Sequence, residues 1–144
     1  MKTLVCKLAV STLVAAALSV GVAKAQITHD IHFTAPSSFV AGEATLPAGK
    51  YVIRLVSVTG DKGALEIAST SGSHSVIVDV ESSSSETPAK STGVIFSKYG
   101  NSLVLSEIVL ANQKTGYSIS SKHAEKRVAK GQTPTKQPVA AEEK

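Results

Sequence analysis

The chain has 144 residues, with 15 Lys and Arg against 11 Asp and Glu, and only 4% of its residues are aromatic. Its length allows one domain with one modest core. Residues 26–121 carry six bases and eight acids, whereas residues 122–144 carry six bases and three acids. The net positive charge therefore comes from the two ends of the chain, and it does not indicate nucleic-acid binding.

The first 25 residues predict a cleaved export signal. Lys2 and Lys7 are followed by an apolar run up to residue 22, and Ala23-Lys24-Ala25 is a small-x-small cleavage site. The run is shorter than the roughly 20 residues that span a bilayer, so we expect no transmembrane segment after cleavage. Cleavage after Ala25 also removes Cys6, the only cysteine, which excludes disulfides, thiol catalysis and thiolate metal sites from the exported chain. We expect that chain in the periplasm or outside the cell.

Short strands and turns are predicted from residue 27 onward. In Leu46-Pro47-Ala48-Gly49, Pro47 favours the second position of a β-turn and Gly49 can adopt a positive φ, so the pattern predicts a hairpin loop. The strand that follows alternates, with Tyr51, Ile53 and Leu55 on the face that we assign to the core. The strands predicted in this half of the chain cover residues 27–34, 39–41, 50–58 and 64–69.

The second half of the chain continues this pattern. Residues 75–81 show the clearest alternation, with three valines on one face and Asp79 and Glu81 on the other. Tyr99-Gly100-Asn101 predicts a second hairpin, and residues 82–92 read as a polar surface loop. The further strands are predicted over residues 93–98, 102–110 and 116–120.

A short helix is predicted over residues 122–130. Ser121 is a suitable N-cap, Glu125 lies in the first turn, and Gly131 is a plausible C-cap. The residues beyond it contain two prolines and little apolar surface, so we predict a disordered tail over residues 131–144.

Together these elements predict an all-β protein. We expect one domain over residues 26–130, an antiparallel β-sandwich of about seven or eight strands that ends with the short helix, and the disordered tail lies outside this domain. The predicted core consists of aliphatic and aromatic side chains at every second position: Tyr51, Ile53, Leu55, Val76, Val78, Val80, Phe96, Leu103, Leu105, Tyr117 and Ile119.

Two runs carry a resemblance to known proteins: Phe39-x-x-Gly42-x-x-x-Leu46-Pro47-Ala48-Gly49-x-Tyr51-x-Ile53, and Val94-Ile95-Phe96-x-Lys98-Tyr99-Gly100-Asn101 with the later Lys122-x-x-Glu125-Lys126. The chain resembles small exported proteins of unknown function from soil bacteria, of the acidobacterial type. This resemblance implies a secreted β domain and no particular activity. Locally, Leu-Pro-x-Gly-x-Tyr is also similar to prealbumin-like repeats of bacterial surface proteins. Some of those repeats form a Lys–Asn crosslink, but the first strand here has no lysine.

Candidate reactive residues are few and weakly clustered. His29 and His32 would point to opposite faces of a strand and so cannot easily share a metal ion. His74 and Asp79 could be paired with a serine, and Asp79 with Glu81 would lie about 7 Å apart on one strand face. Neither pattern has the supporting motif of a hydrolase. Gly60-Asp61-Lys62-Gly63 lacks the features of a phosphate loop.

The predicted helix gathers positive charge. Lys122, His123, Lys126, Arg127 and Lys130 could contact an anionic surface, although no aromatic residues are interleaved for base stacking. A free sheet edge could also accept a partner's strand.

These observations favour a non-enzymatic exported protein that acts by binding or structural association at the cell envelope. We assign it no catalytic, cofactor-binding or metal-binding residues. Its expected partner is an envelope protein or a surface polymer, and not nucleic acid. The alternative is a small hydrolase or carbohydrate-active module that uses Asp79, Glu81 or His74. A small-ligand carrier would require an unfilled barrel interior.

Overall fold

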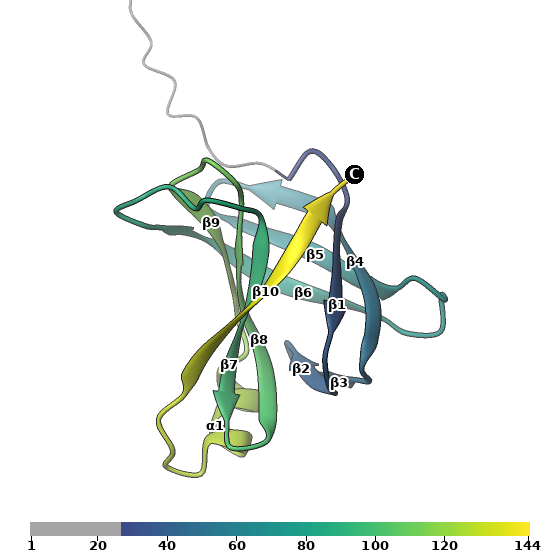
Figure 1. Ribbon diagram of the computed structural model, residues 1–144, viewed down its shortest axis with the longest axis vertical. Helices are drawn as coiled ribbons and strands as arrows, with labels where there is room; N and C mark the ends of the chain where they lie inside the picture. Colours follow the sequence, from purple (N-terminus) through teal and green to yellow (C-terminus); the bar gives the residue numbers. More distant parts are fainter. Residues whose placement is uncertain (1–26) are drawn as a thin grey trace, which may run out of the picture.

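The computed structural model describes residues 27–144, so the predicted export signal over residues 1–25 lies outside the described part of the chain. That part contains ten strands and one helix, α1 (Lys122–Ala129) (Figure 1). The strands are β1 (Ile31–Ala35), β2 (Phe39–Ala41), β3 (Ala44–Leu46), β4 (Gly49–Thr59), β5 (Lys62–Ser69), β6 (Ser75–Ser84), β7 (Gly93–Tyr99), β8 (Ser102–Val109), β9 (Thr115–Ile119) and β10 (Thr135–Glu143).

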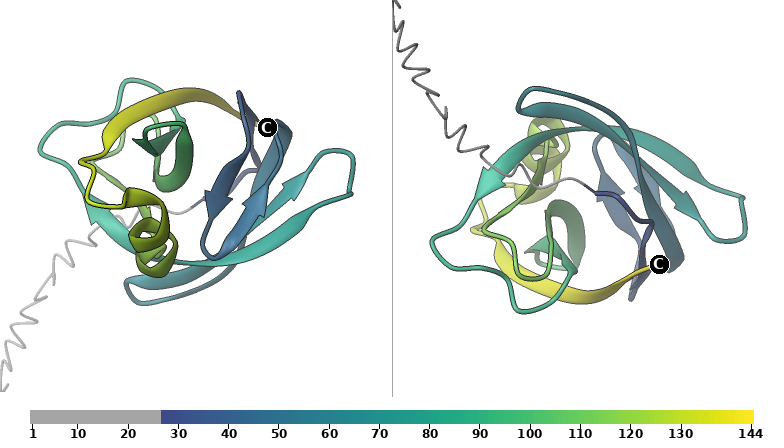
Figure 2. Two further views of the ribbon diagram at one scale, coloured as in Figure 1. Left: turned by 90° about the horizontal axis from the view of Figure 1, so that it is seen from below. Right: turned by 90° about the horizontal axis from the view of Figure 1, so that it is seen from above.

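Eight of these strands form a closed barrel rather than the predicted sandwich. The order β8-β7-β10-β1-β4-β5-β6-β9 returns to its start because β9 pairs with β8 as well as with β6. Views from below and above show the strands arranged around one interior (Figure 2). The alternation along each strand is the same in a sandwich and in a barrel, so closure depends on which outer strands meet.

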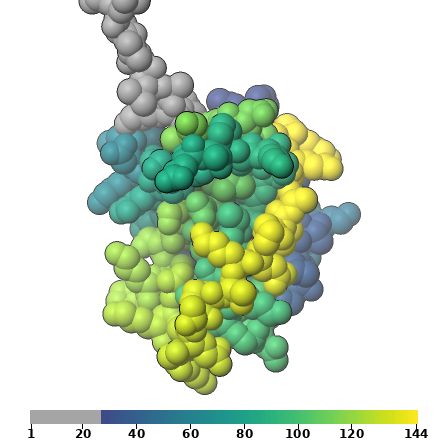
Figure 3. Space-filling view, turned by 60° about the vertical axis from the view of Figure 1, so that its left-hand side comes forward, coloured from purple at the N-terminus to yellow at the C-terminus, as the bar shows by residue number. Residues whose placement is uncertain are grey.

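The predicted disordered tail is wrong, because most of it forms β10. This strand pairs antiparallel with β7 over residues 135–140 and with β1 over residues 141–143. It runs diagonally across the surface from the end of α1 (Figure 3). By joining β7 to β1, β10 closes the barrel. Without β10, nothing joins β7 to β1, so the prediction of a disordered tail implied a sheet that does not close.

The β2–β3 hairpin is attached to the lower part of the barrel. β2 pairs in parallel with β8, and Gly42 adopts a φ of 59° in the hairpin turn. The turn at Pro47 is not the predicted hairpin, because β3 pairs with β2 whereas β4 pairs with β1 and β5. Instead, the chain turns a corner there, and the Tyr51 hydroxyl donates a hydrogen bond to the Pro47 carbonyl over 2.7 Å.

Side chains fill the barrel interior. Phe39 lies at the centre of an aromatic cluster, with its ring centroid 5.2 Å from Tyr51, 5.4 Å from Phe96 and 6.1 Å from Phe33. All four rings are buried. Such close packing is typical of a protein core and leaves the interior without the space that a ligand carrier requires.

The predicted core is confirmed at most of its positions. Only Leu55 and Val76 are partly buried, and both pack against the core; the other nine predicted residues are buried. Period-two alternation therefore identified the inward faces correctly, although the way in which the sheet closes was predicted wrongly.

Helix α1 ends one residue earlier than predicted. Lys130 takes the C-cap position in a left-handed conformation, with a φ of 41°. Ser121 is the N-cap residue, but its hydroxyl makes no capping bond and is buried without a partner among the described residues. Among residues 27–144, no helix has both the length and the apolar character that crossing a membrane requires.

Candidate functional site

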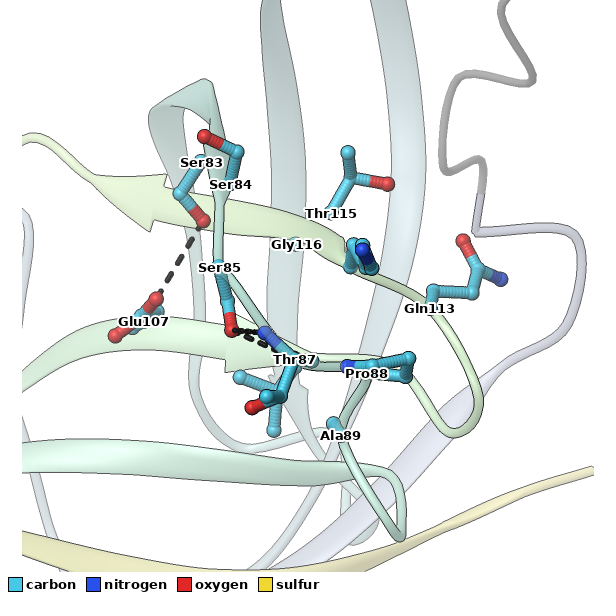
Figure 4. Close-up of a pocket in the computed structure, with 12 residues that line it drawn as sticks. Ser83, Ser84, Ser85, Thr87, Pro88, Ala89, Glu107, Gln113, Thr115 and Gly116 are labelled. Atoms are coloured by element: carbon cyan, nitrogen blue, oxygen red, sulfur yellow. Dashed lines mark hydrogen bonds between the residues drawn. The ribbon is translucent and has the colours of Figure 1, made fainter.

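A hollow of about 170 Å³ opens where the segment after β6 lies against the turn between β8 and β9 (Figure 4). Half of its lining residues carry hydroxyl or amide side chains, and Glu107 lies at one side. The lining residues are Ser83, Ser84, Ser85, Thr87, Pro88, Ala89, Glu107, Val109, Gln113, Lys114, Thr115 and Gly116. We refer to this feature as the hydroxyl hollow.

Backbone hydrogen bonds hold the outer wall of the hydroxyl hollow in place. Ser85 N–H donates to the Lys114 carbonyl over 2.7 Å, and Ala89 N–H donates to the Gln113 carbonyl over 3.1 Å. In return, Asn112 N–H donates to the Ala89 carbonyl over 2.8 Å. The segment that was predicted as a plain surface loop is therefore tied to the β8–β9 turn, and the hollow has a defined shape.

Glu107 is fixed by contacts on both of its carboxylate oxygens. The Lys136 Nζ lies 3.2 Å from Oε2, and the Ser83 hydroxyl lies 3.5 Å from Oε1. The Glu107 side chain keeps a quarter of its surface exposed. It can therefore still accept a hydrogen bond from a bound hydroxyl or amide group.

On the opposite wall, Ser85 caps its own loop. Its hydroxyl donates to the Thr87 carbonyl over 2.6 Å and accepts from Thr87 N–H over 3.3 Å, as the dashed lines in Figure 4 show. Hydroxyl groups that close such local turns keep the backbone in one conformation.

Gly116 lines the hydroxyl hollow where β9 pairs with β8. A Cβ atom at this position would collide with the carbonyl oxygen of Ile108 on the neighbouring strand β8. Glycine thus allows β8 and β9 to approach closely where they pair.

The chemistry of this lining suits binding rather than bond cleavage. Hydroxyl and amide groups donate and accept hydrogen bonds, and they orient a polar ligand without activating it. Glycoside hydrolysis usually requires two carboxyl groups flanking the bond, but Glu107 is the only carboxylate in this lining. The small volume fits a segment of a larger molecule, since pockets for whole small molecules typically measure about 300–1,000 Å³.

A wider and more open groove of about 430 Å³ lies over β1 and β10. Its rim carries His32, Lys50, Glu142 and Lys144, and Val139 contributes an apolar surface. Lys144 already contacts Glu142, with Nζ 3.8 Å from Oε2. The groove arises because β10 turns from β1 toward β7, so the two strands diverge.

The structure separates the two candidate histidines of the first strand. His32 lies on β1 opposite Val52 and Glu142, on the outer side of the barrel. His29 precedes β1, and its Nδ1 lies 3.0 Å from the Thr28 hydroxyl. His32 lines the wider groove, whereas His29 lines a different and much smaller hollow beside Ile27 and Gln113.

His74, Asp79 and Glu81 do not share a cleft. His74 is exposed in the turn before β6, where its Nδ1 lies 2.9 Å from the Ser73 hydroxyl. Asp79 is five residues farther along the strand, about 16 Å away by strand rise. Glu81 lines a hollow beside the N-terminus of α1, which neither His74 nor Asp79 lines. The geometry therefore lends no support to the alternative prediction of a hydrolase built on these residues.

The remaining candidates lie at the surface. Gly60 and Asp61 form the tight turn between β4 and β5, without a following helix. On α1, the basic side chains are exposed, and Arg127 contacts Glu43 of the β2–β3 turn, with 3.3 Å between Nη2 and Oε2. One positive charge of this helix is therefore paired with the β2–β3 turn.

Burial affects three tyrosines. Burial raises the pKa of Tyr51 above its usual value of 10.0, and it also raises the pKa of Tyr99, where the Glu125 carboxylate adds to the effect. Burial likewise raises the pKa of Tyr117, while a hydrogen bond with the Ile27 backbone acts in the opposite direction. All three phenols therefore favour the protonated form in the folded chain.

Sequence reasoning missed the hydroxyl hollow. Its residues come from three separate stretches, around Ser84, Glu107 and Thr115, and they meet only because β6, β8 and β9 pair. The run of four serines was the one available signal, and its composition indicated only a polar loop.

Comparison with known proteins yields no relative. No protein-family model, no curated protein and no solved structure matches this chain.

Proposed function

We propose that this protein is exported and acts without catalysis, by binding a polar partner at the cell envelope through the hydroxyl hollow. The single observation that carries this proposal is the lining itself, in which hydroxyl and amide side chains make up half of the residues and lie beside the fixed carboxylate of Glu107. The expected partner is a surface polymer or the glycosylated or otherwise polar segment of an envelope protein.

The packed interior supports an external site. Because the aromatic cluster around Phe39 fills the barrel, a ligand would have to bind on the outside. The hollow is small and bounded by backbone hydrogen bonds, which favours recognition of one unit within a longer chain.

Export and binding can be tested separately. The full coding sequence is expressed in a bacterial host, the chain is recovered from each cell fraction, and its N-terminus is sequenced. Export predicts a chain in the envelope or medium that begins at Gln26. An intact N-terminus on a chain confined to the cytoplasm would contradict this part of the proposal.

Binding is measured by co-sedimentation with purified insoluble peptidoglycan and by titration with soluble surface polysaccharides. Thr115→Val removes a hydroxyl group from the hydroxyl hollow, and Glu107→Gln replaces the charged carboxylate with a neutral amide, so each should weaken binding about three- to tenfold. Thr34→Val, which makes the same change in the wider groove, is the matched control. If Thr34→Val weakens binding and Thr115→Val does not, the site has been assigned to the wrong groove. If the unaltered chain binds neither class of polymer, the polymer form of the proposal fails.

A further inference from the structure

β6 presents an unpaired backbone edge in its first half. Over residues 75–78, β6 pairs with β5 on one side, whereas β9 pairs with β6 only over residues 80–84 on the other side. Among the described residues, no strand continues the sheet beside residues 75–78. This part of β6 belongs to the β5–β6 hairpin, which projects from the barrel (Figures 1 and 2).

The hydrogen bonds around this edge show which backbone groups are available. The Asp79 carbonyl accepts from Ser120 N–H on the β9 side, and Ser82 N–H donates to Asp61 on the β5 side. Backbone groups alternate between the two sides of a strand, so those of Ser75 and Ile77 face the open side. Each residue offers one donor and one acceptor there.

The side chains of this edge favour pairing. Ile77 is 63% exposed, the largest exposed fraction of any large hydrophobic residue in the described part of the chain. Val76, on the inner face, is only partly buried against the core. Between residues 75 and 78 there is no lysine, proline or glycine, the residues that usually protect an edge or weaken a strand.

The edge is complementary to itself. If two copies pair antiparallel about a two-fold axis at Val76, Ser75 of each copy lies opposite Ile77 of the other, and their backbone groups form four hydrogen bonds.

From these observations we infer that the protein associates with a second copy of itself through the open edge of β6, forming a sheet that continues from one barrel into the other. The edge is only four residues long, so the interface falls below the roughly 1,200–2,000 Å² of standard stable complexes. The dimer is therefore weak and dissociates on dilution. This inference does not depend on the hydroxyl hollow.

Sedimentation velocity over a dilution series, from about 1 mM down to about 10 μM, measures the association. The sample is the chain expressed from its full coding sequence, with its mass determined. Ile77→Lys places a charge on the open edge and should weaken dimerisation at least tenfold. Val56→Lys is the matched control, because Val56 is 53% exposed but lies at the bulge of β4, away from the open edge of β6. A chain that stays monomeric throughout, or two variants that behave alike, would overturn the inference.

Cysteine crosslinking tests the register. In a Cys6→Ser background, Val76→Cys places two thiols opposite each other at the two-fold axis, where Cα atoms lie about 4.5 Å apart. Ile77→Cys, as the control, places its two thiols on a diagonal with Cα atoms about 7–8 Å apart. We expect Val76→Cys to form the disulfide dimer at least tenfold faster than Ile77→Cys. Equal rates, or crosslinking at neither position, would contradict the proposed pairing, and circular dichroism confirms that each variant is folded.

Discussion

Two strands of this barrel, β10 and β6, are each only partly paired along one edge, and their edges differ in character. β10 pairs only with β7 over residues 135–140, whereas β6 pairs only with β5 over residues 75–78. The open side of β10 contains Lys136 and Pro138, and the open side of β6 contains Ser75 and Ile77. Lysine and proline are residues with which native sheets prevent edge-to-edge pairing. The comparison indicates that one edge is protected and the other is available.

The position of Pro138 supports this interpretation. Ala141 N–H donates to the Thr92 carbonyl on the β7 side, so the even-numbered residues of β10 direct their backbone groups toward the open side. The missing N–H of Pro138 therefore costs no hydrogen bond to β7. The same proline removes a donor from the edge that a partner strand would need.

The largest effect is expected from removing the protected strand. A chain that ends after Gly131 lacks β10, so β7 and β1 no longer meet and the barrel is open. We expect destabilisation by at least about 5 kcal/mol, which would abolish the cooperative transition. Urea unfolding followed by circular dichroism measures this, with Pro138→Ala as the control that keeps the strand. A truncated chain with an unchanged transition would show that β10 is not part of the folded barrel.

Substitutions of Tyr51 measure how much the packed interior of the barrel contributes to the free energy of unfolding. Tyr51→Ala removes a buried ring from the aromatic cluster and should destabilise the chain by about 3–5 kcal/mol. Tyr51→Phe keeps the ring and loses only the hydrogen bond to Pro47, so about 1 kcal/mol is expected. Chemical denaturation of both variants separates packing from hydrogen bonding. A loss below 1 kcal/mol for Tyr51→Ala would mean that the core has been misplaced.

The pH dependence of unfolding at alkaline pH tests whether the strands that carry the two edges unfold together, in one cooperative transition. Because burial raises the pKa of Tyr51, Tyr99 and Tyr117 above 10.0, the folded chain retains protons that the unfolded chain loses above that pH. Stability is therefore unaffected by these groups below pH 10 and falls as the pH rises past it. Denaturation midpoints at pH 8, 10 and 11 measure the slope, which should be shallower in Tyr51→Phe. Separate transitions for different probes would contradict a single unit.

The strands that could be predicted from the sequence are those whose own side chains alternate. Val76, Val78 and Val80 gave β6 a clear period of two, and the predicted inward face was correct. β10 has no such signal, since only Val139 and Ala141 pack against the core and Pro138 interrupts the pattern. Its formation depends on pairing with β7 and β1, which are distant in sequence, so local propensity could not reveal it.

The candidate site was unpredictable for a related reason. Glu107 was not singled out, because its role depends on Ser83 and Lys136, which the barrel brings to its two oxygens. Conversely, Asp79 and Glu81 share a strand as predicted, but pairing with β5 and β9 directs them to different surroundings. Spacing along one strand is readable from sequence, whereas contacts between strands require the register.

The smallest effect on stability, and the most direct test of the comparison, comes from removing the protection of β10. Lys136→Val with Pro138→Val should change the free energy of unfolding by less than about 1 kcal/mol, because the Lys136 side chain is largely exposed in its ion pair with Glu107 and Pro138 donates nothing to β7. The same change exposes six residues of unprotected edge. We therefore expect concentration-dependent association of this double variant, which sedimentation velocity can measure, even in an Ile77→Lys background where the β6 edge is blocked. A variant that remains monomeric in that background would show that Lys136 and Pro138 do not keep the β10 edge unpaired, and the distinction between the two edges would then rest on β6 alone.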